Sequence, residues 1–143
     1  MAAGLEKRAF QHLHVQIEVI AEIVTLSERS IGLPPLHMQS CNISKTGICL
    51  QTTALEIDGV KLLAGPPFAR ENRLHLKINL ISQEPPFTAI GEARWYDVVP
   101  DATERKYQIG VEFIDIKDNG KNQLARFLKK HETSDGFFHK IFG

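Results

Sequence analysis

Residues 106–116 read KYQIGVEFIDI, and apolar side chains recur in this stretch at every second position. The residues on the apolar face are Tyr107, Ile109, Val111 and Phe113. Successive side chains of an extended chain point to opposite faces, so a two-residue period indicates a β-strand with one face buried. This stretch therefore predicts a strand that packs against a core.

The same period recurs in several other segments, with turn residues between them. These segments are LHVQIEVIAEIV at 13–24, MQSCNI at 38–43, GICLQT at 47–52, RLHLKINLI at 73–81 and FTAIGEARWYDVV at 87–99. In the last of them, the expected shared face consists of Ala89, Gly91, Ala93 and Trp95. The stretch VKLL at 60–63 is compatible with one more short strand. Six or seven short strands without helices between them are typical of an antiparallel barrel or sandwich.

The pattern changes near residue 118, where apolar residues begin to recur at helical spacing. Leu124, Phe127 and Leu128 predict one amphipathic helix over 118–132, with Asp118 or Asn119 as its N-cap. The tail that follows, 133–143, has four large apolar side chains: Phe137, Phe138, Ile141 and Phe142. An apolar tail of this kind is expected to pack against a surface, either of its own domain or of a partner. A contact in a homodimer is one such possibility.

Composition indicates a single cytoplasmic domain. The chain has 143 residues, with 17 basic and 17 acidic side chains that cancel. A balanced charge argues against general DNA or RNA binding, although it leaves room for a small basic pocket. No apolar run approaches the roughly 20 residues of a membrane span.

No motif of catalysis or metal binding is present in the sequence. There is no HExxH, GxSxG or phosphate-loop pattern, so we expect a binding module and not an enzyme. His12 and His14 share a face of the first predicted strand, but no further ligands with zinc spacing accompany them. Cys41 and Cys49 can meet across a hairpin, and a reduced pair is the interpretation that two cysteines favour.

Four motifs in order resemble the PilZ domain family. They are KRAFQH at 7–12, NISKTG at 42–47, GEARWYD at 91–97 and YQIGVEFIDI at 107–116. They resemble that family's RxxxR segment, its [DN]xSxxG turn and its last two strands. The resemblance implies a six-stranded antiparallel PilZ-type β-barrel with a flanking C-terminal α-helix, and a bacterial, cytosolic module that commonly binds cyclic di-GMP and signals to a protein partner. The single domain, 1–143, would then divide into a basic segment at 1–12, a barrel at 13–116, a helix at 118–132 and a tail at 133–143.

The resemblance also implies a ligand site made from two parts of the chain. Arg8 matches the first arginine of the family motif, and its guanidinium can meet a guanine edge or a phosphate with two parallel hydrogen bonds. On the turn, Asn42 offers a donor and an acceptor, and Ser44 offers a hydroxyl. Gly47 supplies either a positive φ or room for close approach.

The basic segment departs from the family pattern at His12, which stands where the second arginine is expected. Histidine has no planar fork and is largely uncharged near neutral pH, although it can donate one hydrogen bond or stack on a base. Lys7 is a possible auxiliary source of positive charge. Loss of a bidentate ionic contact weakens binding by roughly ten- to hundredfold.

Two functions therefore compete on sequence grounds. The first is a cyclic di-GMP receptor that relays binding to a protein partner. The second is a degenerate PilZ domain that binds little or no nucleotide and serves as a protein-interaction adaptor. The residue that separates the two hypotheses is His12.

Overall fold

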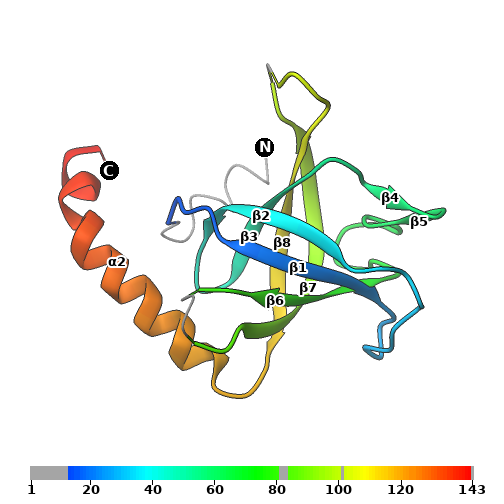
Figure 1. Ribbon diagram of the computed structural model, residues 1–143, viewed down its shortest axis with the longest axis horizontal. Helices are drawn as coiled ribbons and strands as arrows, with labels where there is room; N and C mark the ends of the chain where they lie inside the picture. The colour runs from blue at the N-terminus through cyan, green and yellow to red at the C-terminus, as the bar shows by residue number, and fades with distance from the viewer. Residues whose placement is uncertain (1–12, 81–83, 101, 143) are drawn as a thin grey trace.

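A closed barrel of six antiparallel strands forms the body of the protein in the computed structural model, which describes residues 13–80, 84–100 and 102–142 (Figure 1). The barrel strands are β1 (Glu18–Val24), β2 (Leu36–Ile43), β3 (Gly47–Thr52), β6 (Arg73–Ile78), β7 (Phe87–Val98) and β8 (Tyr107–Ile116). Their order around the barrel is β1–β2–β3–β8–β7–β6, and β6 pairs with β1 to close it. The predicted antiparallel barrel is confirmed.

The residues at 60–63 form less strand than the sequence suggests. Only Val60–Lys61 is extended, as β5, and it pairs with β4 (Glu56–Ile57) in a small hairpin outside the barrel. Asp58 and Gly59 both have positive φ, at 49° and 84°, as a two-residue hairpin turn of type I′ requires.

The apolar faces predicted from the two-residue period point into the barrel. Val19, Leu76, Ile78 and Ile109 are all fully buried in one continuous core. Burying a side chain of this size stabilises the fold by about 1.5–3 kcal/mol, so the core residues dominate the stability of the barrel.

Trp95 departs from its predicted face because of a β-bulge. The pairing of β7 with β8 skips from Ala93 to Trp95, so that Arg94 is an extra residue and the alternation of side chains changes beyond it. A Cβ placed on Gly110 would collide with the indole ring of Trp95, whereas the two neighbours of Gly110 point into the core. The indole therefore covers the outer surface of β8, and the prediction that it shares a face with Ala93 is wrong.

The first strand is shorter than the predicted 13–24. Regular pairing begins at Glu18, and the preceding segment is attached to β2 by a backbone hydrogen bond from the Ser40 amide to the Ile17 carbonyl at 2.9 Å and by the Ser40 side chain. The Ser40 hydroxyl, which is almost fully buried, accepts a hydrogen bond from the Ile17 amide at 2.8 Å and donates one to the Val15 carbonyl at 2.5 Å. This arrangement holds the segment before β1 against the barrel.

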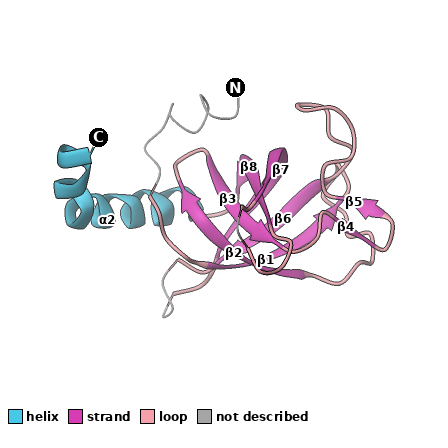
Figure 2. Cartoon of the chain, turned by 90° about the horizontal axis from the view of Figure 1, so that it is seen from above, coloured by secondary structure: helices cyan, strands magenta, loops and turns pink. Residues whose placement is uncertain are grey.

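A single helix, α2 (Gly120–Phe142), follows the barrel and lies on the opposite side from the β4–β5 hairpin (Figure 2). Asn119 precedes it as the N-cap, and its carbonyl accepts the amide of Gln123 at 3.1 Å. Leu124 and Phe127 are buried against the core, as the helical spacing predicts.

The helix continues beyond the predicted boundary at residue 132, so that the expected tail at 133–143 is helical as far as Phe142. The side-chain contacts of the tail phenylalanines, Phe137, Phe138 and Phe142, lie outside what the structure describes. Within the described residues, no helix combines the length and the apolar character needed to cross a membrane.

Arg70 supports the bulge in β7 from the loop before β6. Its guanidinium is buried and donates hydrogen bonds to the carbonyls of Ala93 at 2.8 Å and Arg94 at 3.0 Å, which lie at the bulge. It also donates to the carbonyls of Leu63 and Gly65. Burial lowers the pKa of Arg70 from its ordinary value, but an arginine remains charged under all ordinary conditions.

Replacement of Arg70 by methionine should lower the free energy of unfolding by about 2–4 kcal/mol, because buried carbonyls lose their donor. Urea denaturation followed by Trp95 fluorescence measures the change. Arg29→Met, at an exposed position, is the matched control and should shift stability by less than about 0.5 kcal/mol. Equal effects of the two substitutions would show that the guanidinium does not support the bulge.

Gly47 marks the closest approach of β3 to β8. It pairs with Glu112, and a Cβ at this position would collide with the carbonyl oxygen of Val111. Its φ is not positive, so space and not backbone conformation is the reason for glycine here.

Gly47→Ala should therefore destabilise the protein by about 1–3 kcal/mol even in the absence of any ligand, because the barrel wall must open to admit the methyl group. Thermal and urea denaturation of the purified variant test this. Lys45→Ala, an exposed change in the same turn, should leave stability unaltered. If Gly47→Ala were as stable as the parent, the close contact with β8 would not be a constraint.

Candidate functional site

The turn between β2 and β3 contains the three site residues of the NISKTG motif. Its backbone closes through a hydrogen bond from the Ser44 amide to the Gly47 carbonyl at 2.9 Å. On the other side, the Thr46 carbonyl accepts the Phe113 amide of β8 at 2.8 Å. The turn is thus fixed to the barrel at both ends, and it projects little.

The Ser44 hydroxyl is directed into the turn. Ser44 is only 1 % exposed, and its Oγ accepts a hydrogen bond from the Thr46 amide at 3.3 Å. Serine hydroxyls commonly close turns in this way. Ser44 therefore has a clear structural role, and its hydroxyl would have to rotate outward to contact a ligand.

Asn42 lies at a second β-bulge. The pairing of β2 with β3 runs from Ser40–Leu50 to Asn42–Cys49, which leaves Cys41 as the extra residue. In a bulge of this kind, two successive residues face one residue of the partner strand. Asn42 is half-buried on β2, so its amide is accessible beside the turn.

The segment that precedes β1 reaches the same turn through one pair of backbone hydrogen bonds. The Leu13 amide donates to the Ile43 carbonyl at 2.9 Å, and the Ile43 amide donates to the Leu13 carbonyl at 3.0 Å. Ile43 is the residue between Asn42 and Ser44. The structure therefore places Leu13 beside the turn, and Lys7, Arg8 and His12 lie outside the described residues.

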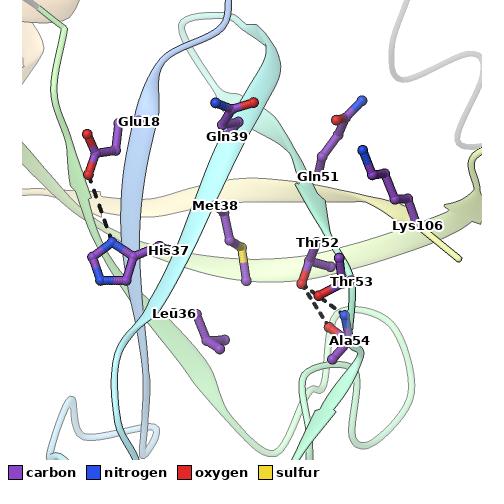
Figure 3. A pocket seen from close by; sticks show the side chains of 10 residues that line it. All are labelled: Glu18, Leu36, His37, Met38, Gln39, Gln51, Thr52, Thr53, Ala54 and Lys106. Atoms are coloured by element: carbon purple, nitrogen blue, oxygen red, sulfur yellow. Dashed lines mark hydrogen bonds and ion pairs between the residues drawn. The ribbon is translucent and has the colours of Figure 1, made fainter. Parts of the chain in front are cut away.

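A pocket of about 480 Å³ opens on β1, β2 and β3, away from the turn (Figure 3). Its polar lining includes Gln39 and Gln51, which are paired across β2 and β3, and Lys106. The Glu18 carboxylate lies 3.8 Å from the ring of His37 at one edge. Of the site residues that the structure describes, Asn42, Ser44 and Gly47 do not line this pocket. Sequence reasoning did not anticipate it, because its lining combines residues from separate strands and loops.

A cluster of charges on the outer face of β7 and β8 was also missed. Glu92 and Glu112 are opposite each other in register, and Arg94 bonds to both carboxylates at 2.6 Å. The guanidinium of Arg94 also lies 4.2 Å from the centre of the Phe68 ring. Because like charges directly opposite each other are destabilising, Arg94 relieves a repulsion in the sheet. The sequence shows Glu-x-Arg at 92–94. That Glu112 lies opposite Glu92 depends on how β7 pairs with β8, which the sequence does not reveal.

The described part of the chain also lacks side chains that are grouped to bind a metal ion. Those residues contain no group of three or more histidine, cysteine, aspartate or glutamate side chains placed to hold a metal ion. His14 is exposed on the segment before β1.

Comparison with known proteins identifies the fold. Residues 6–130 match the family model of the PilZ domain. No curated protein matches the chain significantly.

Several solved structures share the barrel at low sequence identity. The inhibitor of motility MotI/DgrA of Bacillus subtilis has a TM-score of 0.61 and 17% identity, with 90% of this chain and 52% of that chain covered. The PilZ domain of YcgR from Escherichia coli, solved with c-di-GMP, has a TM-score of 0.56 and 13% identity, with 94% and 98% covered. PlzA of Borreliella burgdorferi, in complex with c-di-GMP, has a TM-score of 0.54 and 10% identity, with 94% and 56% covered.

The chain spans about half the length of the MotI/DgrA and PlzA chains and nearly the whole of the YcgR domain. At these identities the structures establish the shared fold, and the family model covers the motifs from the basic segment to α2. The chain belongs to the PilZ domain family.

Proposed function

We propose that this protein is a receptor for cyclic di-GMP, which it binds between the segment before Leu13 and the turn at 42–47. The observation that supports the proposal is the Leu13–Ile43 pair of hydrogen bonds, because Leu13 directly follows the RxxxR-like segment in the sequence and Ile43 belongs to the NxSxxG turn. Two of the structures with the same fold, from Escherichia coli and Borreliella burgdorferi, are complexes with c-di-GMP.

The residue types suit this ligand, which combines guanine bases with phosphates. Arg8 would bind a guanine edge or a phosphate through its fork, and Asn42 would hydrogen-bond a base edge from the bulge. His12 directly precedes Leu13 in the chain, so it would enter the site beside Asn42 and donate a single hydrogen bond or stack. Gly47 would contribute indirectly, by letting β3 approach β8 so that the turn keeps its shape.

Binding of cyclic di-GMP could be relayed to a protein partner through the surface around the ligand. A partner that contacts both the bound nucleotide and the protein around it would bind the ligand-loaded form more tightly. The partner and a possible homodimer remain predictions.

An adaptor without nucleotide binding is the second candidate. Two observations favour it: histidine replaces the second arginine, and the Ser44 hydroxyl is buried in its own turn. Exposed apolar residues for protein contact are available as well, namely Phe68, Tyr96 and Val98.

Calorimetric titration with cyclic di-GMP at low and moderate salt separates the two candidates. The receptor should bind in the micromolar range or somewhat more weakly, and Arg8→Ala should reduce affinity by at least about tenfold because a charged fork is lost. Arg29→Ala removes the same charge from the exposed loop after β1 and should leave affinity within about twofold. The absence of heat and of any thermal shift at high micromolar ligand would eliminate the receptor.

Restoration of the missing arginine gives a gain-of-function test. His12→Arg should tighten cyclic di-GMP binding by roughly ten- to hundredfold, because a second bidentate contact is added. His14→Arg, two residues further on and exposed, adds the same charge and controls for general attraction of an anion. Comparable gains from both variants, or none from His12→Arg, would contradict a site that closes over the turn.

A further inference from the structure

Two thiols lie against each other beside the turn. The Sγ atoms of Cys41 on β2 and Cys49 on β3 are 2.8 Å apart. They are the only cysteines of the 143-residue chain. Cys49 is buried at 4 % exposure, whereas Cys41 is partly accessible.

The bulge in β2 is the reason for this contact. Cys41 is its extra residue, and Cys41 and Asn42 together face Cys49 across the hairpin. A disulfide needs Cβ atoms roughly 3.5–4.5 Å apart, and the 2.8 Å between the two sulfurs places Cys41 within reach of Cys49. The two sulfurs need to approach by less than about 1 Å to reach bonding distance.

We propose that Cys41 and Cys49 are a redox modification site, at which a hydroperoxide produces a reversible intrachain disulfide. The more accessible thiol, Cys41, attacks the peroxide oxygen as its thiolate, and the O–O bond breaks. This step yields a sulfenic acid on Cys41 and releases water or an alcohol. Cys49 then attacks that sulfur and displaces water, so that the two thiols lose two electrons and two protons to the peroxide.

The disulfide would close a short loop around the turn at 42–47. Such a cross-link restricts the unfolded chain, and it also ties β2 to β3 at the bulge. The consequence for the ligand rests on the proposed function. If the Ser44 hydroxyl must rotate out of its turn to contact cyclic di-GMP, a stapled turn resists that change, and the oxidised protein binds more weakly.

Intact-protein mass spectrometry tests the modification without reference to any ligand. The reduced chain is treated with a few equivalents of hydrogen peroxide, alkylated with N-ethylmaleimide under denaturing conditions and weighed. We expect a monomer that has lost two hydrogen atoms and accepts no alkyl groups, and dithiothreitol should restore both sites. The thermal midpoint of the oxidised form should be higher by roughly 5–10 °C.

A matched variant keeps two thiols on the same hairpin but separates them. In Cys49→Ser combined with Gln51→Cys, the second thiol moves to the position that pairs with Gln39, where the diagonal Cβ distance of about 7–8 Å is too long for a disulfide. This variant should form the intrachain bond at least about tenfold more slowly. Equal rates in the two proteins would overturn the proposal, as would parent protein that yields only sulfinic acid, only intermolecular dimers or unchanged thiols.

Titration of the oxidised and reduced forms with cyclic di-GMP tests the consequence separately. We expect the affinity of the oxidised form to be at least about threefold lower, and dithiothreitol to restore it. Equal affinities would overturn the effect on the ligand while the mass result stands. Absence of binding in both forms would instead overturn the receptor function.

Discussion

Closure of six short strands into a barrel is the constraint on which the other features of this protein depend. Strands that curve far enough to close need local breaks in their pairing, and bulges provide them. One bulge lies at Cys41 in β2 and another at Arg94 in β7. Each of them re-aims side chains: the first places Asn42 and Cys41 opposite Cys49, and the second turns Trp95 onto the outside of β8.

Backbone groups at the bulge in β7 and in the segment before β1 form hydrogen bonds with buried side chains. The carbonyls of Ala93 and Arg94 receive the buried guanidinium of Arg70, and the segment before β1 receives the hydroxyl of Ser40. These polar groups are almost fully enclosed, where an unsatisfied partner is far more destabilising than at the surface. Buried hydrogen-bonding side chains, Arg70 and Ser40 among them, therefore stabilise the barrel together with its apolar core.

The position of the candidate site follows from the same geometry. The segment before β1 contacts the turn through the Leu13–Ile43 pair. That pair places Leu13 at the turn, where Asn42 is half-buried and Ser44 is almost fully buried. The proposed site would combine this turn with the residues that precede Leu13 in the sequence.

Much of the fold could be predicted from the sequence, because period-two patterns depend only on which residues are apolar. Leu74, Leu76 and Ile78 are buried as that pattern requires. The face of Trp95 could not be predicted, since a bulge depends on the pairing of two strands and leaves no mark in one of them. Arg70 was missed for the same reason, because a buried arginine in a loop is indistinguishable in sequence from an exposed one. The site motifs were recognised only through the family resemblance, and the close contact of Gly47 with β8 depends on a neighbour far away in the chain.

Amide hydrogen exchange with and without cyclic di-GMP tests the central claim most directly, because it reports on both halves of the site at once. We predict that peptides covering the basic segment up to Leu13 and the turn at 42–47 gain protection together when the ligand is added. Protection confined to another surface, such as the pocket lined by Gln39 and Gln51, or no change at saturating ligand, would contradict a site joined at the Leu13–Ile43 pair.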